Sequence, residues 1–299
     1  MRMRENLPRN GQSSRKIKHK ISLFFKSLTL YNVSDFFCFG GDFMGGTGSS
    51  IGGGGSAIII EKKSALKDMT TRDQLSDYFL TNYNILLETN LKNIEFDLLK
   101  ESLEGVDDML QRYPEVKEMI PKIFYEKNGG GYAAYSWYND NRGFGIEFNS
   151  SMKDRATFDP LIKKDQENGF HPKNDSSAQT LAHETAHALE RYIAKKTGQR
   201  GFAISEVVVK TAYRNVYKEP AYTPNDPTSS FKKSCRGISG YAASNFKRTS
   251  GLFKKAGVHQ YTETWAEAFA DVYSNGKHAN PFSKEIVRIA TEYYKGNYT

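Results

Sequence analysis

Cysteine is scarce in this chain, and long apolar runs are missing. The 299 residues include two cysteines, Cys38 and Cys235, which lie far apart in segments of different character. Neither a disulfide framework nor a cysteine-based metal site is therefore expected. No stretch of about 18 consecutive apolar residues occurs, so we expect no membrane-spanning helix and no membrane partner. A signal peptide is not expected either, because Lys26 and Ser27 interrupt the short apolar run over residues 21–30.

Acidic residues are few at the start of the chain. Residues 1–43 contain eight lysines and arginines against three acidic residues, and so carry five of the eight net positive charges. The excess positive charge is therefore mostly a property of this leader. No basic stripe interleaved with aromatic residues on a known module occurs, so a nucleic-acid partner is not expected.

The first 56 residues are expected to be a disordered leader, basic at first and rich in glycine over residues 45–56. A phosphate-binding loop is disfavoured there, because the tract lacks the Gly-Lys-Ser/Thr ending of such loops. Residues 40–44, Gly-Gly-Asp-Phe-Met, can be encoded by codons that contain a bacterial ribosome-binding sequence just before a start codon. A second hypothesis is therefore that residues 1–43 are untranslated leader sequence and that Met44 begins the protein.

Residues 57–299 are predicted to form one α+β domain whose N-terminal part, residues 57–121, is helical. Capping residues and prolines indicate helices over about 70–84 and 95–112, followed by a short helix from Pro114 to Ile120. The second half is predicted to be largely helical as well. Its expected elements are a helical or mixed segment over 204–217, helices over 261–273 and 283–294, and a loop rich in Pro, Asn and Ser over 220–230.

A small antiparallel sheet with a hairpin is predicted between these helical parts. Three runs rich in aromatic and β-branched residues are separated by Asn-Gly-Gly and Asn-Asp-Asn-Arg-Gly turns, and they span 122–126, 131–138 and 143–149. The last strand is either an exposed edge that could pair with an extended peptide or an ordinary strand inside the sheet. Residues 150–176 are expected to form a polar loop.

The motif His183-Glu184-Thr185-Ala186-His187, which reads H-E-x-x-H, is the strongest functional signal. Residues four apart share a face of a helix, so His183 and His187 can direct two imidazoles at one metal ion. Glu184 beside them is placed to take a proton from a water on that ion. Zinc is the expected ion, because imidazole and carboxylate suit it and catalytic sites leave one position for water. Capping candidates at 175–177 and at Gly198 bound the helix.

The third ligand is expected from the helix predicted over residues 261–274. Glu263, Glu267 and Asp271 lie four residues apart there, on one face. Either Glu263 binds the metal with Glu267 behind it, or Glu267 binds it with Asp271 behind it. The carboxylate behind would accept the other ring N–H of a ligand histidine and fix its tautomer. The alternative of a solvated acidic face is disfavoured by apolar neighbours such as Trp265.

Two other ligand sets fit the sequence less well. A third histidine six residues after His187, as in metzincins, would fall at Ile193, and position 190 holds Glu190 and not glycine. His259 lies four residues before Glu263 and could compete for the metal, although a lone loop histidine is more often a surface group.

Three motifs in order carry a resemblance to a known family. H-E-x-x-H is followed by Ser-x-Tyr-Ala-x-x-Asn at 239–245 and by Glu-x-x-Ala-Glu-Ala-Phe-Ala-Asp at 263–271. Together they resemble the gluzincin metallopeptidases, namely the peptidase domain of anthrax lethal factor and the related metallopeptidase-like proteins encoded in phage and prophage head-gene regions. The resemblance covers roughly residues 140–290. It implies a zincin-like α+β fold with an H-E-x-x-H active-site helix, and a zinc-dependent endopeptidase.

The resemblance also assigns roles. It implies His183, His187 and Glu263 as the zinc ligands, Glu184 as the general base and Glu267 as the carboxylate behind a ligand histidine. It implies Tyr241 as the tyrosine that stabilises the tetrahedral oxyanion or donates a proton. The link between Asn245 and Glu263 is longer than the family's usual one, so Tyr261 stays open as an alternative source of the phenol.

Two further functions compete with a peptidase that acts on a protein or peptide substrate. One is a structural or morphogenesis protein of a phage or mobile element that retains a zincin fold, with phage head proteins as partners. A purely structural site has no need of Glu184, which disfavours this reading. The other is a delivered toxin peptidase that acts on a host protein, for which a delivery route would be needed. A cytoplasmic or virion-associated location is expected.

Overall fold

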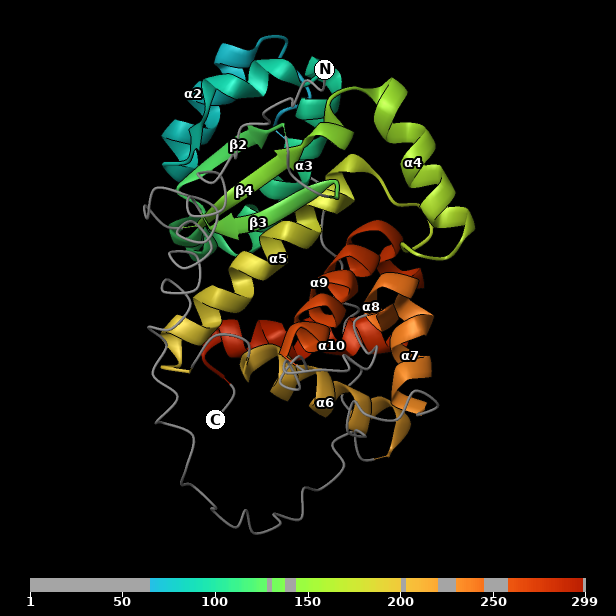
Figure 1. The fold of residues 1–299 in the computed structure, drawn as a ribbon. Helices are drawn as coiled ribbons and strands as arrows, with labels where there is room; N and C mark the ends of the chain where they lie inside the picture. Colours follow the sequence, from blue (N-terminus) through green and yellow to red (C-terminus); the bar gives the residue numbers. More distant parts are fainter. Residues whose placement is uncertain are drawn as a thin grey trace, which may run out of the picture. The chain divides into compact units, whose positions relative to one another are not determined.

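The computed structural model describes residues 65–127, 131–137, 144–199, 203–219, 230–244 and 258–297. All of them belong to one compact unit, Gly55–Thr299. The predictions for residues 1–56, including a start at Met44, lie outside the described residues, as does most of the loop predicted over 220–230. The described residues form a mixed α+β structure that is mostly helical, with one small sheet (Figure 1).

Helices occupy most of the described chain. The α-helices are α2 (Arg72–Tyr83), α3 (Phe96–Arg112), α4 (Arg155–Glu167), α5 (Ser177–Lys196), α6 (Ala203–Tyr217), α7 (Ser230–Ile238), α8 (Gly240–Ser244), α9 (Val258–Asn275) and α10 (Pro281–Lys295). The strands are β1 (Leu86–Leu87), β2 (Lys122–Glu126), β3 (Ala133–Trp137) and β4 (Phe144–Asn149). Short 3₁₀ helices are η2 (Thr89–Asn93), η3 (Pro114–Met119), η4 (Ser150–Met152) and η5 (Gly276–His278). The helices predicted over 70–84, 95–112, 261–273 and 283–294 are thereby confirmed, and the segment 204–217, predicted to be helical or mixed, is helical.

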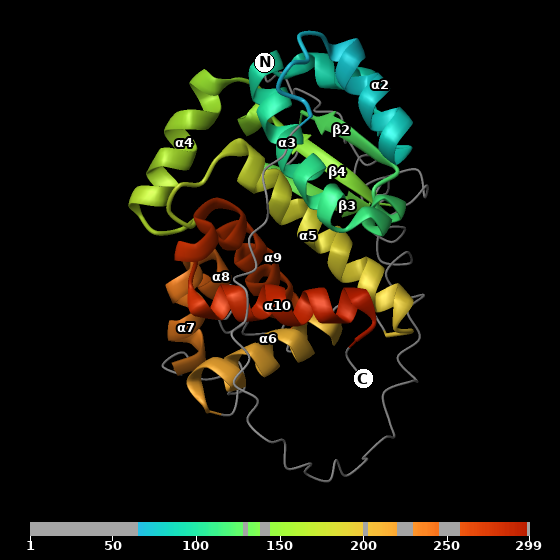
Figure 2. The same cartoon turned by 180° about the vertical axis from the view of Figure 1, so that it is seen from behind.

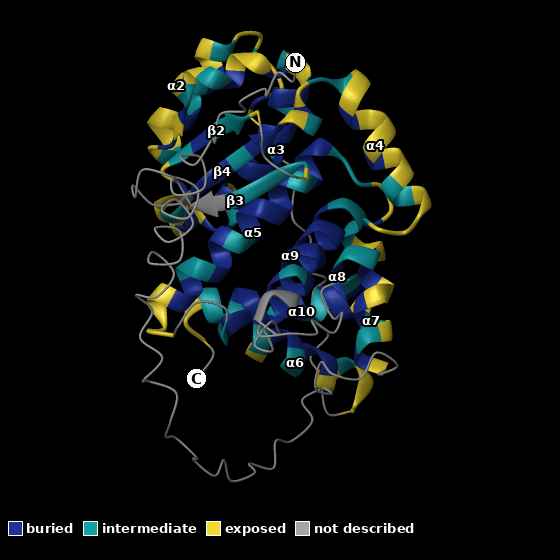
Figure 3. Cartoon of the chain, viewed as in Figure 1, coloured by how far each residue is buried: buried dark blue, intermediate teal, exposed yellow. Residues whose placement is uncertain are grey.

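The sheet is mixed, and the prediction of an antiparallel sheet is wrong. Its strand order is β1-β2-β4-β3, in which β1 pairs parallel with β2, β2 pairs parallel with β4, and only β3 and β4 form an antiparallel hairpin. The last strand, β4, is inside the sheet because it pairs with β2 on one side and with β3 on the other. Its residues Ile146 and Phe148 are fully buried. The two edge strands are β1 and β3, and the described side chains of β3 are half-buried (Figure 3).

Helix α4 lies where a polar loop is predicted. Its first turn is capped by Asp154, whose Oδ1 accepts the backbone N–H of Thr157 at 2.8 Å. Phe158 and Ile162, four residues apart, supply the buried stripe of an otherwise polar helix. The stripe is too short, and Pro160 inside the helix is too strong a breaking signal, for composition to indicate a helix here.

Helix α5, which carries the H-E-x-x-H motif, is central to the described fold. Its start is fixed by the Ser176 hydroxyl, which accepts the N–H of Gln179 at 3.2 Å, and Gly198 follows its end in the left-handed conformation. The predicted capping positions are confirmed. One side of α5 packs along α3 and beside β3, and the other packs on α9, which in turn contacts α6, α8 and α10 (Figures 1 and 2). Among the described residues, no helix combines the length with the apolar character that crossing a membrane requires.

The packing of α3 on α5 depends on a glycine. A Cβ atom added to Gly105 would lie 1.8 Å from the carbonyl oxygen of Ala178. That oxygen belongs to the backbone of the first turn of α5, so it has no rotamer by which to move away. Gly105 therefore allows α3 to approach the start of the metal-motif helix.

We expect Gly105→Ala to destabilise the fold by about 3 kcal/mol, because the added methyl group forces two helices apart. Gly237→Ala is the matched control, since its Cβ would meet only the Asn280 side-chain amide, at 3.2 Å. Gly237→Ala should change the free energy of unfolding by less than about 1 kcal/mol, because the higher helix propensity of alanine offsets the mild contact. Urea unfolding followed by circular dichroism measures both values. Equal stability of the two variants would contradict the close approach.

Candidate metal centre

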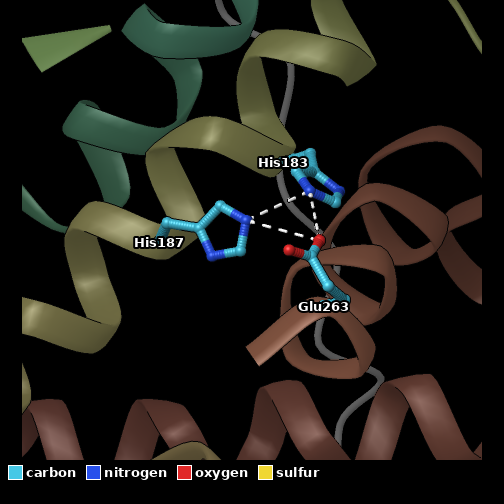
Figure 4. Close-up of side chains that lie close together, drawn as sticks. All are labelled: His183, His187 and Glu263. Carbon is cyan, nitrogen blue, oxygen red and sulfur yellow. Dashed lines mark hydrogen bonds and ion pairs between the residues drawn. The ribbon is translucent and has the colours of Figure 1, made fainter. Parts of the chain in front are cut away.

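Two histidines and one glutamate converge between α5 and α9 (Figure 4). The Nε2 atoms of His183 and His187 lie 3.2 Å apart. The Oε2 atom of Glu263 lies 3.4 Å from Nε2 of His183 and 3.7 Å from Nε2 of His187. Each residue thus offers one ligand atom to a common point, and the three could hold a metal ion. His187 and Glu263, which are 76 positions apart in the chain, meet because α9 crosses the middle of α5.

Helix α9 is set against α5 by contacts on both sides of Glu263. Trp265 is fully buried, and its indole N–H donates to the backbone carbonyl of Ala186 at 2.9 Å. Thr262 donates its hydroxyl to the buried carboxylate of Glu190 at 3.2 Å. Together these bonds fix the rotation of α9 about its own axis. The side chain of Glu263, which lies between Thr262 and Trp265 in the sequence, therefore points at the two histidines.

Glu267, one turn further along α9, contacts the opposite nitrogen of the first histidine. Its Oε1 atom lies 2.9 Å from Nδ1 of His183. Although burial opposes it, hydrogen bonds from His171 and His183 lower the pKa of Glu267 to about 2. An ionised Glu267 holds the proton of His183 on Nδ1 and leaves Nε2 as a lone-pair donor. Of the two predicted arrangements, the observed contacts match Glu263 at the ligand position with Glu267 behind it.

Asp271 is not at the histidines. Its Oδ1 atom accepts the side-chain amide of Asn275 at 2.8 Å, and its Oδ2 atom accepts the backbone N–H of Asn280 at 2.9 Å. The carboxylate thus joins the end of α9 to the start of α10. The sequence places Asp271 on the same face of α9 as Glu263 and Glu267, but its carboxylate bonds to Asn275 and Asn280 and not to a histidine of α5.

The side chain of Glu184 extends from α5 towards strand β3, at an edge of the sheet. The backbone N–H of Tyr135 on β3 donates to its Oε2 atom at 2.7 Å. The Glu184 side chain lines a cavity next to His183, and its burial raises its pKa to about 7. A carboxylate near neutrality can both take and return a proton. The edge strand β3 therefore runs directly beside the glutamate of the motif.

Tyr241, and not Tyr261, lies at the centre. The Tyr241 ring is 6.1 Å from the His183 ring, and it lines the same cavity. Burial and the nearby carboxylates raise the pKa of Tyr241, so its hydroxyl keeps its proton. Tyr261 is buried on another side of α9, against Phe231 and under the ammonium group of Lys210. The side chain of His259, the weaker ligand candidate, lies outside the described residues.

A third histidine near the centre is not evident from the sequence. His171, in the segment between α4 and α5, has its Nδ1 atom 3.6 Å from Asp175 and 3.8 Å from Glu267. Its segment is held by Gly169 and Phe170, whose carbonyls accept the N–H groups at the start of α8 at 2.7 and 2.8 Å. No spacing signal marks His171, because it reaches the site through an irregular backbone and not through a helix face.

The cavity next to His183 and Glu184 has a volume of about 550 Å³. Its walls come from the start of β3, from α4, from the segment around His171 and from the first turn of α5. Tyr241 and Glu267 complete them. The site is therefore open on one side to a space large enough for a side chain of a bound molecule.

Comparison with known protein families, with curated proteins and with solved structures finds no match for this chain. The function must accordingly be argued from the site itself.

Replacement of each carboxylate on α9 should separate their roles. We expect Glu263→Gln to remove most bound metal, because a charged ligand is lost. Glu267→Gln should weaken metal binding about 10- to 100-fold, because only the support of His183 changes. Asp271→Asn, the same chemical change one turn further, should leave metal content unaltered. Metal content per chain after dialysis against a chelator provides the measurement. Retention of metal by Glu263→Gln together with its loss from Glu267→Gln would reverse the assignment.

Proposed function

We propose that this chain is a zinc-dependent peptidase of the gluzincin type, with a zincin-like fold. The observation that supports it most strongly is the triangle of His183 Nε2, His187 Nε2 and Glu263 Oε2, with sides of 3.2, 3.4 and 3.7 Å. A tetrahedral zinc ion with ligands at about 2.0–2.1 Å requires ligand atoms about 3.3–3.4 Å apart. Two imidazoles and one carboxylate leave the fourth position open, as catalytic zinc sites do.

The chemistry follows from the groups around that position. A zinc ion held there supplies a Lewis acid that polarises a carbonyl and makes a water molecule acidic near neutral pH. Glu184 takes the proton from the attacking water and later gives it to the leaving amine, so that the peptide bond breaks into a carboxylate and an amine. The N–H of Tyr135 holds the Glu184 carboxylate in position for both transfers.

Tyr241 is the group that we assign to the oxyanion. Its hydroxyl is protonated, and a phenol that donates a hydrogen bond to the developing negative charge stabilises the transition state more than the ground state. The backbone at Tyr241 is held by its own N–H group, which donates to the carbonyl of Phe170 at 2.8 Å. A positioned donor of this kind requires no rearrangement during the reaction.

The substrate is expected to lie along β3. This strand is an edge of the sheet, and the N–H of Tyr135 points away from β4 towards Glu184. An extended peptide added to this edge would place a peptide bond beside the motif. If it ran antiparallel to β3, the residues after the scissile bond would lie at the start of the strand, where the cavity opens.

Glu184→Gln tests the proposal directly. The amide keeps the size of the side chain and its bond to Tyr135 but has no basic oxygen, so hydrolysis should fall by at least about 100-fold while metal content stays unchanged. Cleavage of a peptide library, read by mass spectrometry, together with metal analysis of the same preparation, provides the comparison. A Glu184→Gln protein as active as the wild type would exclude this mechanism.

Tyr241→Phe and Tyr261→Phe form a matched pair that identifies the oxyanion donor. We expect Tyr241→Phe to lower kcat about 100-fold with little change in KM, since the lost bond acts in the transition state. Tyr261→Phe should leave kcat within about threefold of the wild type, because that ring lies away from the cavity. Steady-state kinetics on one peptide decide between them. The reverse result would assign the role to Tyr261.

A further inference from the structure

The cavity beside the metal centre combines an apolar rim with a charged floor. Leu161 on α4 and Phe170 both line it, and their side chains are among the large apolar ones that remain exposed. Exposed apolar groups at the mouth of a cavity next to a reactive centre indicate contact with a ligand. An aliphatic chain that entered the cavity would lie between these two residues.

The floor carries more negative than positive charge. His171 is surrounded by three carboxylates: Asp165 Oδ2 lies 3.9 Å from its Nε2, and Asp175 and Glu267 lie 3.6 and 3.8 Å from its Nδ1. All four residues line the cavity. Burial raises the pKa of Asp175 to about 7, and Glu267 faces His183 as well as His171. Asp165, the most accessible of the three carboxylates, is therefore the one that favours a cation.

Glu267, one of the residues that line the cavity, also has an acceptor without a donor. The Oε2 atom of Glu267 is buried and accepts no hydrogen bond from the described residues. A buried carboxylate oxygen without a donor is unfavourable, so a ligand that donates hydrogen bonds would be stabilised here. Asp165 is more accessible than the other two. Its Oδ2 atom accepts the Tyr132 hydroxyl at 2.5 Å, and no described residue donates to its Oδ1 atom.

We propose that this cavity selects a lysine or arginine side chain next to the scissile bond. The methylene groups of such a side chain would contact Leu161 and Phe170, and its cationic end would pair with Asp165 and donate towards Glu267. A purely apolar side chain would cover these carboxylates without pairing them, and an acidic one would be repelled. The inference rests on the proposed peptidase function, to which it adds the class of substrate.

The test uses short alanine-based peptides that differ only at one central residue. Lysine is compared with norleucine and arginine with citrulline, so that shape is kept while charge is removed. One arm measures kcat/KM on the zinc-loaded wild type, with mass spectrometry to locate the cut on either side of the central residue. The other arm measures binding of fluorescent versions to zinc-loaded Glu184→Gln protein, which does not depend on turnover.

We expect the cationic peptide of each pair to be preferred at least about tenfold in both arms, since a charge-assisted hydrogen bond is lost in the neutral analogue. Asp165→Asn should bring this ratio close to one. Asp159→Asn is the matched control on the same helix, where the carboxylate pairs with Arg155 at 3.7 Å and does not line the cavity, and it should keep the ratio. Thermal unfolding of both variants checks that they are folded.

The two arms separate the two proposals. Cleavage without any preference for the cationic peptides would overturn the cavity assignment and leave the peptidase standing. A tenfold preference in binding that Asp165→Asn abolishes, without cleavage by the wild type, would support the cavity and overturn the peptidase. Equal binding of all four peptides to the Glu184→Gln protein, or a preference that survives Asp165→Asn, would overturn the cavity assignment.

Discussion

The crossing of α5 and α9 is the contact on which the site depends. A metal centre needs ligand atoms a few ångströms apart, and here they come from helices that a long and varied stretch of chain separates. The indole N–H of Trp265 bonds to the carbonyl of Ala186, inside the motif itself, at 2.9 Å. Because an α-helical carbonyl already accepts a bond within its own helix, this additional donor is worth most where the pair is buried. Trp265 is fully buried, so the bond is shielded from water and holds Glu263 in register with both histidines.

Local chemistry in the sequence was sufficient for α5 and α9. The periodic apolar residues, the cap at Ser176 and the i, i+4 spacing of the ligands are all short-range signals, and short-range signals survive in a single sequence. The same reasoning placed Glu263 and Glu267 on one face without deciding between them. The motif resemblance favoured Glu263 as the ligand, and the distances of the two carboxylates from the nitrogens of His183 match that arrangement.

The parts that sequence reasoning missed are those fixed by long-range packing. The pairing of β2 with β4 is parallel because the chain returns to the middle of the sheet after β3, and turn residues carry no information on that choice. Helix α4 has only Phe158 and Ile162 as buried apolar residues, in a sequence otherwise typical of a loop. His171 reaches the centre from an irregular segment whose course depends on two backbone bonds to α8. Contacts of this kind have no periodicity to detect.

The electrostatics of the centre also favour a bound cation. Glu184, Glu190, Glu263 and Glu267 are all largely withdrawn from water within a small region, and burial of like charges is costly unless they are compensated. The Thr262 hydroxyl partly compensates the burial of Glu190, and His183 partly compensates the burial of Glu267. Glu263 has the two imidazole nitrogens as its close neighbours, at distances longer than good hydrogen bonds. A divalent ion between the Glu263 carboxylate and the two imidazole nitrogens would replace these weak contacts by coordinate bonds. It would also offset the surplus negative charge. Metal binding would therefore stabilise the α5–α9 crossing, because an ion would bind the same residues that the crossing brings together.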